Sequence, residues 1–377
     1  MEIKGFCNAK FALVKEEFER NFSERGDVGA CFALTVEGEC VVDIWAGHQD
    51  AARSRPWAED TLVNVFSSTK TMSFLCVLIL VDRGLLDLEA PVAQYWPEFG
   101  ANGKKQLKVK HLLSHSAGLP GFSRPFDVSD LCNWQQCCED LAAQASWWKA
   151  GTQSGYHAIT QGYLIGEVIR RVSGQTVGQF FKLNVADQVD ADFHIGLYPT
   201  QFDRIADLIP TLRPSVLVDL PPDSIVSRVF TDLADITEFV ATPAWRQAEI
   251  PAVNGHGNAR SIVRAQTAIA NSGKAFGVQL LSAENCLKAL EPQTSGVDLV
   301  LGVDLNFGMG YALPSPAVPT DPSVNPKTLW WGGAGGSSIV LDLDANLCFS
   351  YVMNQMGSGL LGDIRGASLA NAVYKSL

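Results

Sequence analysis

One segment near the N-terminus constrains the fold of this chain more than any other. A short run of apolar and β-branched residues, Leu62 to Phe66, is followed directly by a helical pattern from about Ser67 to Arg83. That pattern is apolar on nearly every face, and a helix of this kind must be surrounded by other elements. Gly84 suits the end of such a helix, because glycine readily adopts the left-handed conformation found there. The sequence therefore predicts a short strand that leads into a central, buried helix.

The rest of the chain has strand patterns at both ends. Val28 to Gly47 contains two apolar stretches that predict a β-hairpin. An amphipathic helix is expected before it, because four apolar side chains recur at a spacing of three to four: Phe11, Val14, Phe18 and Phe22. Near the C-terminus the sequence predicts three strands and a last helix, at Trp330–Trp331, Ser338–Leu343, Leu347–Val352 and about Asp363–Lys375.

Helical patterns dominate the middle of the chain, from about Leu85 to His256. They cover Val109–His115, Ser129–Gln144, Thr160–Val172, Val177–Leu183 and Asp232–Val240, and a further helix follows at Arg260–Ala270. Loops are expected in the proline-rich runs Pro199–Pro222 and Pro314–Pro326. The simplest packing joins both ends of the chain in one antiparallel sheet. We expect an α/β (α+β) fold with a discontinuous domain of residues 1–84 and 256–377, and a mainly helical inserted domain of residues 85–255.

Composition excludes several classes of protein. The chain of 377 residues is 47% hydrophobic and only 18% charged, so it can bury a large core and is not disordered. Its net charge of −11 gives no electrostatic basis for binding a phosphate backbone, which argues against a nucleic-acid partner. The longest near-apolar run, Met72 to Val81, is about half of the ~20 residues that span a bilayer, so no membrane partner is expected.

The cysteines bear on location and on metal binding. The N-terminal segment is charged throughout and does not resemble a secretion signal. Nine cysteines is an odd number, and most of them lie in apolar contexts. Cys132, Cys137 and Cys138 cluster, but two adjacent cysteines are poor metal ligands, and no CxxC pair occurs. We therefore expect free thiols in a reducing cytoplasm, with no metal and no organic cofactor.

The first chemistry-bearing motif is the S-x-x-K formed by Ser67 and Lys70. Ser67 would lie at the N-terminus of the buried helix, where backbone N–H groups favour developing negative charge. Lys70 lies one turn further on the same face, and burial lowers the pKa of such an amine, so that it could accept the serine proton. The alternative is that Ser67 only caps the helix. A second match, Ser146 to Lys149, has no buried helix behind it and is expected to be a loop.

Two further elements could complete a site. Tyr156 follows a glycine in front of a helix, so its hydroxyl could project into a cleft, and we expect its pKa to fall beside Lys70. The run from Trp330 to Ser337 holds four glycines but is followed by a strand pattern, which argues against a phosphate loop. Glycines at a strand edge instead allow close backbone approach, and an N–H there could face the Ser67 N–H as an oxyanion hole. Each element alone could be merely structural.

The histidines and other known motifs point away from competing chemistries. His111 and His115 are four residues apart, but Leu112 follows the first, where a zinc protease needs a glutamate. Both histidines are therefore expected to be structural. The chain also lacks the G-x-S-x-G nucleophile elbow of α/β-hydrolases.

Together these motifs resemble the serine β-lactamase/penicillin-binding superfamily, and within it the class C β-lactamase-like esterases (family VIII carboxylesterases). The resemblance covers nearly the whole chain. It rests on Phe66–Lys70, on His111–Leu119, which is similar to the family's HLLSHTSGL segment, on Gly155–Gly174, and on Trp331–Ser337. It implies a β-lactamase-like antiparallel sheet flanked by helices. It also implies that Ser67 is the nucleophile, that Lys70 is its base partner, and that Tyr156 is the base or proton relay. The N–H groups of Ser67 and Ala334 would form the oxyanion hole.

Two departures from the family pattern bear on substrate. Penicillin-recognising members carry Tyr-x-Asn, where this chain has Ala158, and Lys-Thr-Gly, where it has Trp331, Gly332 and Gly333. A lost charge-assisted contact is worth roughly 1.5–3 kcal/mol. The resemblance therefore implies a site for uncharged acyl groups, in which the triplet contacts substrate and Trp331 offers an apolar wall.

We accordingly expect a serine carboxylesterase that hydrolyses short-chain acyl esters, small-molecule substrates, through an acyl-enzyme on Ser67. Three alternatives stay open. An acyltransferase of the same fold would use an alcohol in place of water. A β-lactamase or D-amino peptidase could have weak ester side activity. A non-catalytic binding module could retain the fold.

Overall fold

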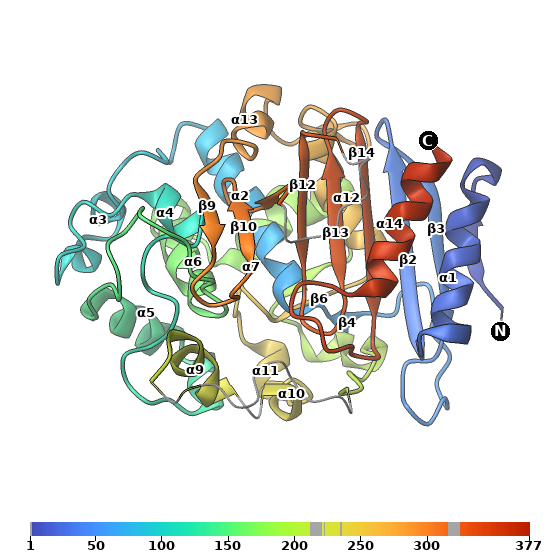
Figure 1. Ribbon diagram of the computed structural model, residues 1–377, viewed down its shortest axis with the longest axis horizontal. Helices are drawn as coiled ribbons and strands as arrows, with labels where there is room; N and C mark the ends of the chain where they lie inside the picture. Colours follow the sequence, from blue (N-terminus) through green and yellow to red (C-terminus); the bar gives the residue numbers. More distant parts are fainter. Residues whose placement is uncertain (1, 212–220, 222, 234–235, 316–324) are drawn as a thin grey trace.

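The main sheet joins both ends of the chain. The computed structural model describes residues 2–211, 221, 223–233, 236–315 and 325–377. Within them the main sheet is antiparallel and has nine strands, in the order β1-β3-β2-β14-β13-β12-β11-β10-β9 (Figure 1). The strands are β1 (Lys4–Cys7), β2 (Gly29–Val36), β3 (Glu39–Gly47), β9 (Thr294–Val297), β10 (Asp304–Phe307), β11 (Ala312–Leu313), β12 (Thr328–Gly332), β13 (Ser338–Asp342) and β14 (Leu347–Met353). N-terminal and C-terminal strands meet where β2 pairs with β14, which confirms the predicted antiparallel sheet.

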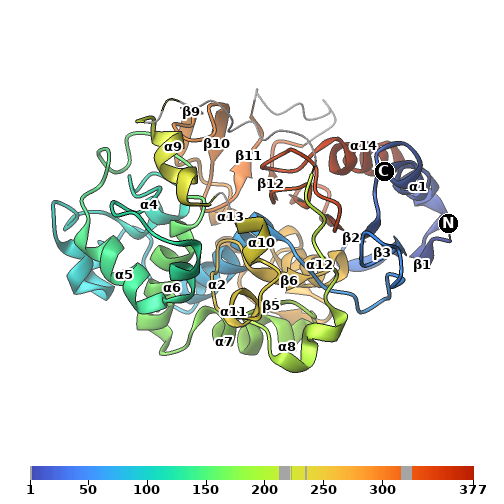
Figure 2. The same cartoon turned by 90° about the horizontal axis from the view of Figure 1, so that it is seen from below.

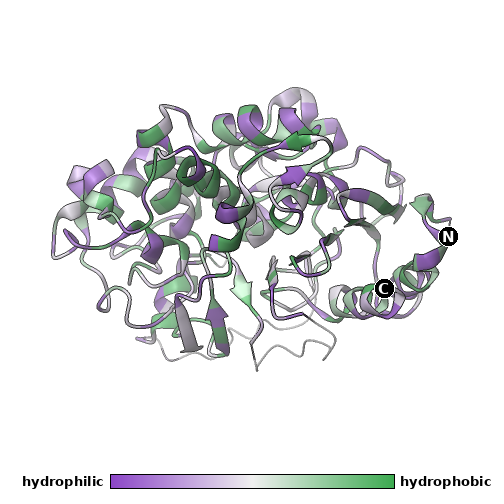
Figure 3. Cartoon of the chain, turned by 90° about the horizontal axis from the view of Figure 1, so that it is seen from above, coloured by the Kyte–Doolittle hydropathy of each residue, from purple (hydrophilic) through white to green (hydrophobic). Residues whose placement is uncertain are grey.

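Helices cover both faces of this sheet. Helices α1 (Ala12–Glu24) and α14 (Ile364–Ser376) lie side by side on one face, close to both chain termini (Figure 1), and α12 (Ala259–Ala270) packs on the other. Side chains of β14 alternate between the two layers: Phe349 joins the core under α1 and α14, whereas Cys348 joins the core on the α12 side. Because both faces are covered, every residue of β14 is buried. Figure 3 shows how hydrophobic (green) and hydrophilic (purple) residues alternate along the helices and strands of these layers.

The central helix is α2 (Lys70–Asp82). It follows β4 (Val63–Asn64) and a short 3-10 helix at Phe66–Thr69, and it is buried from Lys70 to Leu80. Gly84, just after the helix, has a φ of +68°, a value that glycine tolerates better than other residues. The predicted strand, buried helix and glycine stop are therefore confirmed. A small sheet in the order β4-β6-β5 adjoins them, with β5 at His194–Ile195 and β6 at Gly255–Gly257.

The middle of the chain is mainly helical, as predicted (Figure 2). Its helices are α3 (Val92–Tyr95), α4 (Val109–Leu113), α5 (Trp134–Ala143), α6 (Thr160–Ser173), α7 (Val177–Phe181), α8 (Asp187–Val189), α9 (Ile225–Phe230), α10 (Ile236–Phe239) and α11 (Pro243–Gln247). Helix α13 (Ala283–Lys288) and a two-stranded sheet, β7 (Lys274–Ala275) with β8 (Val278–Gln279), follow α12. The division into 1–84 with 256–377 and 85–255 stays a prediction.

Some expectations fall partly or wholly outside this description. Residues 212–220, 222 and 316–324 of the two proline-rich loops lie outside the described residues, as do 234–235 of the helix expected at Asp232–Val240. The sequence did not predict β1, β9 or β10, because short strands with few buried positions lack a long alternating pattern. Of the helices described, none has the length and apolar character needed to cross a membrane.

Candidate active site

Ser67 lies at the junction between β4 and α2, in a 3-10 turn with an uncommon backbone conformation. Phe66, just before it, has a φ of +44°, which is sterically costly for a bulky residue. The Thr69 hydroxyl donates a 2.5 Å hydrogen bond to the Phe66 carbonyl oxygen and accepts one from the Gly255 N–H at 2.8 Å. The turn is therefore held by side-chain contacts that link it to β6. Strain of this kind is frequent at functional sites.

Three predicted residues, Ser67, Lys70 and Tyr156, come together at this junction. The Ser67 Oγ lies 2.5 Å from the Tyr156 Oη and 3.2 Å from the Lys70 Nζ. The Lys70 Nζ also lies 4.9 Å from the centre of the Tyr156 ring. Ser67 keeps 6% of its surface exposed, and Tyr156 keeps 3%. A hydroxyl that contacts both an amine and a phenol can lose its proton to one of them as it attacks.

The environment of Lys70 favours a neutral amine. Burial holds the pKa of Lys70 well below its ordinary value, as the sequence predicted. Its Nζ donates to the carbonyl oxygens of Ala158 at 2.7 Å and Ala252 at 3.0 Å. A neutral amine has two N–H bonds and one lone pair. When the two carbonyls take both N–H bonds, the lone pair is left for the Ser67 hydroxyl.

The expectation that the pKa of Tyr156 falls was wrong. Burial raises this pKa well above its ordinary value; the hydrogen bond with Ser67 opposes the rise, and the charge of Asp298 adds to it. The sequence argument assumed a positive Lys70 next to the phenol, whereas the neutral amine offers no charge to stabilise a phenolate. Tyr156 is therefore a phenol that can donate its proton. Asp298 holds it in place, since the Oδ1 accepts from the Tyr156 backbone N–H at 2.9 Å.

Two buried histidines pack behind the tyrosine. The ring centroid of His115 lies 4.9 Å from that of Tyr156, and the His115 Nδ1 accepts from the His157 N–H at 3.0 Å. The His157 Nε2 accepts from the Leu119 N–H at 2.9 Å. Burial lowers the pKa of His157 to about 3 and holds the pKa of His115 well below its usual range. Both rings are therefore neutral at ordinary pH, and neither places a positive charge beside Lys70.

The glycine-rich loop after β12 approaches the serine closely. A methyl group at Gly333 would overlap the Val65 carbonyl oxygen and lie 3.3 Å from the Ser67 nitrogen. The Ser337 hydroxyl ties the loop to this region with 3.0 Å hydrogen bonds to the Ser68 Oγ and the Val65 carbonyl. Within the described residues, neither the Ser67 N–H nor the Ala334 N–H donates to a carbonyl oxygen. The Ser67 N–H at the start of the helix and the Ala334 N–H after the strand are therefore both free to donate to a substrate oxygen, as an oxyanion hole requires.

Trp331 does not present an open apolar wall. Its side chain is fully buried, with its ring 5.5 Å from that of Tyr156 and stacked at 5.8 Å on that of His115. The side chain points inward from β12 and supports the tyrosine. Gly332 is also buried, and a methyl group on it would overlap the Leu361 carbonyl. The position of each residue along β12 decides whether it faces the core or the site, and the sequence alone did not show which way Trp331 faces.

The remaining sequence candidates lie outside this cluster. The His111 Nδ1 accepts from the Lys108 N–H at the start of α4, a structural role. The Ser146 hydroxyl donates to the Ala117 carbonyl from a loop. All nine cysteines are free. In the part of the chain that the structure describes, no group of three or more His, Cys, Asp or Glu side chains could hold a metal.

Sequence reasoning missed the groups that support the site from distant segments. They are the carbonyls of Ala158 and Ala252 and the side chains of Thr69 and Asp298. Backbone carbonyls carry no residue-type signal, and Asp298 lies in a segment with no recognisable motif. Only Thr69, inside the S-x-x-K motif, could have been singled out.

Comparison with known proteins identifies the family. The family model described as Beta-lactamase matches residues 18–373. The chain belongs to the beta-lactamase family. Within this family it is 34% identical to the esterase/beta-lactamase LipL of Mycobacterium tuberculosis, over 95% of this chain and 84% of that protein. It is 27% identical to esterase EstB of Burkholderia gladioli, over 95% of this chain and 93% of that protein. The crystal structure of a family VIII carboxylesterase superimposes with a TM-score of 0.93 and 38% identity, over all of both chains.

Proposed function

We propose that this beta-lactamase family member is a serine carboxylesterase that hydrolyses short-chain acyl esters through an acyl-enzyme on Ser67. The observation that carries the proposal is the contact of one serine hydroxyl with a phenol at 2.5 Å and with a buried amine at 3.2 Å. The relatives named as esterases, LipL and EstB, and the similar family VIII carboxylesterase structure support ester hydrolysis.

In the acylation step, Lys70 is the base. Its lone pair accepts the Ser67 proton as the Oγ attacks the ester carbonyl carbon, and the carbonyl electron pair moves onto the oxygen. That oxyanion lies between the N–H groups of Ser67 and Ala334, which make no competing carbonyl hydrogen bond within the described residues. The ammonium on Lys70 is stabilised by the carbonyls of Ala158 and Ala252.

Collapse of the oxyanion breaks the bond to the alcohol. Tyr156 donates its proton to the departing alkoxide and regains one from the Lys70 ammonium, so the phenol ends as it began. This role suits a phenol whose pKa is raised by burial. Water then attacks the acyl carbonyl carbon while the neutral Lys70 accepts a proton from it. The Lys70 ammonium returns a proton to the Ser67 Oγ as the acyl bond breaks, which releases the acid and restores the Ser67 hydroxyl.

The substrate we propose is an uncharged ester with a small acyl group. Ala158 offers no side-chain amide to a substrate, and Trp331 offers no cation for a substrate carboxylate. The low exposure of Ser67 and Tyr156 supports a narrow site. Gly332 and Gly333 are proposed substrate contacts through their backbone, because both lie at the strand edge that approaches Ser67.

We also propose that the cleft lies between the predicted domains and that the enzyme works in the cytoplasm. Ser67 belongs to 1–84, Tyr156 to 85–255 and Ala334 to 256–377, so substrate would contact all three parts. Nine free cysteines support a reducing location, because paired cysteines are expected in oxidising ones.

The deciding experiment is covalent labelling. Incubation with p-nitrophenyl butyrate, followed by an acid quench, should add one butyryl group to the protein mass, on the peptide that contains Ser67. Ser67→Ala should lose both the label and hydrolysis. Ser146→Ala is a matched control, because Ser146 begins the other S-x-x-K sequence but lies in a loop. Full hydrolysis by Ser67→Ala would refute the proposal.

Two alternatives give distinct outcomes in the same assay. An acyltransferase would convert most of the acyl group to a new ester when an alcohol acceptor is added. A β-lactamase would turn over nitrocefin at a rate close to that of the ester, a comparison that the name of LipL makes relevant.

A further inference from the structure

The backbone of the loop that carries Ala334 has little intrinsic rigidity. Gly335 has a φ of +90° and Gly336 a φ of +131°. These are conformations that glycine enters and leaves freely, because it has no side chain to restrict rotation. An oxyanion donor must instead be fixed in advance, since a donor that reorients during the reaction contributes less stabilisation. The orientation of the Ala334 N–H must therefore come from hydrogen bonds to this loop.

Two peptide planes transmit that orientation. A trans peptide is planar, with its C=O and N–H pointing in opposite directions. The Gly336 N–H donates to the Gly333 carbonyl at 3.1 Å. The Gly333 carbonyl belongs to the same plane as the Ala334 N–H, so fixing the carbonyl fixes that donor. The Gly336 N–H in turn belongs to the same plane as the Gly335 carbonyl. The Gly333 N–H also donates to the Ser337 carbonyl at 2.8 Å, and the Gly335 N–H donates to the Gly359 carbonyl at 2.9 Å. Together with these bonds, the group that holds the Gly335 carbonyl helps to set the direction of the Ala334 N–H.

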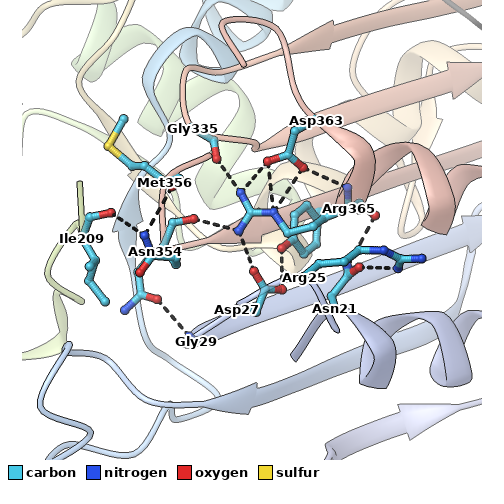
Figure 4. Close-up of polar contacts among 12 residues, drawn as sticks. Asn21, Arg25, Asp27, Gly29, Ile209, Gly335, Asn354, Met356, Asp363 and Arg365 are labelled. Atoms are coloured by element: carbon cyan, nitrogen blue, oxygen red, sulfur yellow. Dashed lines mark hydrogen bonds and ion pairs between the residues drawn. The ribbon is translucent and has the colours of Figure 1, made fainter. Parts of the chain in front are cut away.

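A buried arginine holds that carbonyl. The Arg365 Nη2 donates to the Gly335 oxygen at 2.7 Å, and the Gly357 N–H donates to the same oxygen at 2.7 Å. Figure 4 shows the guanidinium of Arg365 between Gly335, Asp363 and Asp27. The side chain of Arg365 is 4% exposed, so its contacts are shielded from water.

The guanidinium is itself fixed from several sides. Its Nη1 donates to Asp27 at 2.7 Å and to the Gln355 carbonyl at 2.8 Å. Asp363 accepts from the Nε at 3.0 Å and from the Nη2 at 2.5 Å. The loop glycine Gly336 makes this approach possible, because a methyl group on it would lie 2.6 Å from the Nη2. A rigid group on α14 therefore reaches the loop through a gap that only glycine leaves open.

We propose that Arg365 is a positioning residue for the oxyanion hole. It fixes the Gly335 carbonyl, and through two linked peptide planes it directs the Ala334 N–H toward the oxygen of the substrate. The inference rests on the proposed function, which makes Ala334 an oxyanion donor. Arg365 does not touch the reacting atoms. It acts on the transition state, in which negative charge develops on the ester oxygen, more than on the bound ester.

Arg365→Lys is the informative variant. Lysine keeps a positive charge opposite Asp27 but has three N–H donors in place of five, and it lacks the flat, forked shape. Its single nitrogen cannot take the place of both the Nη1, which serves Asp27 and Gln355, and the Nη2, which serves Gly335. We expect kcat/KM for p-nitrophenyl butyrate to fall by about 10- to 100-fold, with KM nearly unchanged. A misdirected oxyanion donor loses part of the transition-state stabilisation that is lost when the donor is removed altogether. The inhibition constant of butylboronic acid, whose tetrahedral adduct places an oxygen in the hole, should rise in parallel.

Controls separate positioning from general loss of stability. Tyr351→Phe removes the 2.6 Å hydrogen bond to Asp27 in the same network without touching the loop. Arg25→Lys alters an arginine that bonds Ser368 on α14 and whose other side-chain partners, Glu17 and Asn21, lie outside the loop. Both should keep kcat/KM and boronate affinity within about twofold, even where the unfolding midpoint falls. Asp363→Asn keeps a side chain that can cap α14, but it removes the negative charge that holds Arg365. It should therefore lower kcat/KM and boronate affinity as Arg365→Lys does, but by a smaller factor.

The outcomes distinguish the two claims. If Arg365→Lys and Asp363→Asn keep kcat/KM and boronate affinity within twofold of the parent, the positioning role is wrong. The positioning role is also wrong if Tyr351→Phe lowers kcat/KM and boronate affinity as much as Arg365→Lys does when the two variants are equally stable. If Arg365→Lys does not fold, Asp363→Asn decides by the same criteria. Hydrolysis that survives Ser67→Ala would instead refute the proposed function and leave Arg365 without an oxyanion hole to position.

Discussion

Among the residues that the structure describes, two lysines, Lys70 and Lys104, are buried, and replacing each by methionine tests what Lys70 does. Lys70 donates to the carbonyls of Ala158 and Ala252 and lies 3.2 Å from the Ser67 Oγ. Lys104 is also buried and donates to three carbonyls, those of Ala101, Ala142 and Gln144, remote from the serine. Methionine is unbranched and similar in length, so it fills either site without an amine. The pair therefore separates loss of a buried amine from loss of a base.

The expected magnitudes differ between stability and rate. A hydrogen bond contributes about 1 kcal/mol net, so Lys70→Met should cost about 2 kcal/mol of unfolding free energy, and Lys104→Met about 3 kcal/mol. Proteins of this kind unfold with about 5–15 kcal/mol, so both variants stay folded. Loss of a general base lowers the rate by about 10²- to 10⁴-fold, or roughly 2.7–5.4 kcal/mol of activation free energy. Only Lys70→Met should suffer it.

Two measurements test the role of Lys70. Urea denaturation gives the stability of each variant, and the rates with p-nitrophenyl butyrate at saturating and at limiting substrate give kcat and kcat/KM. We expect Lys104→Met to keep the parent activity despite its lower stability, and Lys70→Met to lose at least 100-fold in kcat/KM. The reasoning is refuted if Lys70→Met retains more than a tenth of the parent kcat/KM. It is equally refuted if Lys104→Met loses activity to the same extent, because the effect would then follow from buried-amine loss alone.

Two further predictions concern pH and the glycine loop. Burial lowers the pKa of Lys70, so kcat/KM should fall as pH drops through that lowered pKa, because the lone pair then becomes protonated. The profile should reach its plateau well below pH 10.5, the pKa of an unperturbed lysine. A profile that keeps rising up to that pH would contradict the neutral amine. Gly333→Ala should displace the loop from Val65 and Ser67 and lower kcat/KM by about 100-fold or more, which is the cost of losing an oxyanion donor. Gly100→Ala is the active control, because its methyl group would come no closer than 3.1 Å to its nearest neighbour, the Ala93 side chain.

Much of the site could be predicted because its parts are local. Ser67 and Lys70 share one helix face by spacing alone, and the glycines at 332 and 333 indicate close backbone approach whatever their partner. The pKa of Lys70 could be predicted as well, since an apolar helix implies burial. The pKa of Tyr156 could not. It depends on the charge state of Lys70 and on Asp298, which lies more than a hundred residues away in the chain.

Among the features of the sequence, the apolar helix after Phe66 determined most about the fold. A segment that is apolar on every face has to be central, and a serine at its start has to meet whatever packs there. Together with the strand patterns at both ends, the sequence alone predicted one sheet built from both ends of the chain and a serine, Ser67, at the start of the central helix.

Tertiary structure decided which distant groups surround that serine. It turned Trp331 inward against Tyr156 and His115, and it brought Arg365 to the Gly335 carbonyl. It also set the proton states, because desolvation depends on the whole enclosure of a group and not on its neighbours in sequence. Periodicity and spacing report contacts within one helix or strand, whereas orientation, burial and charge at the site arise from segments that meet only when the chain has folded.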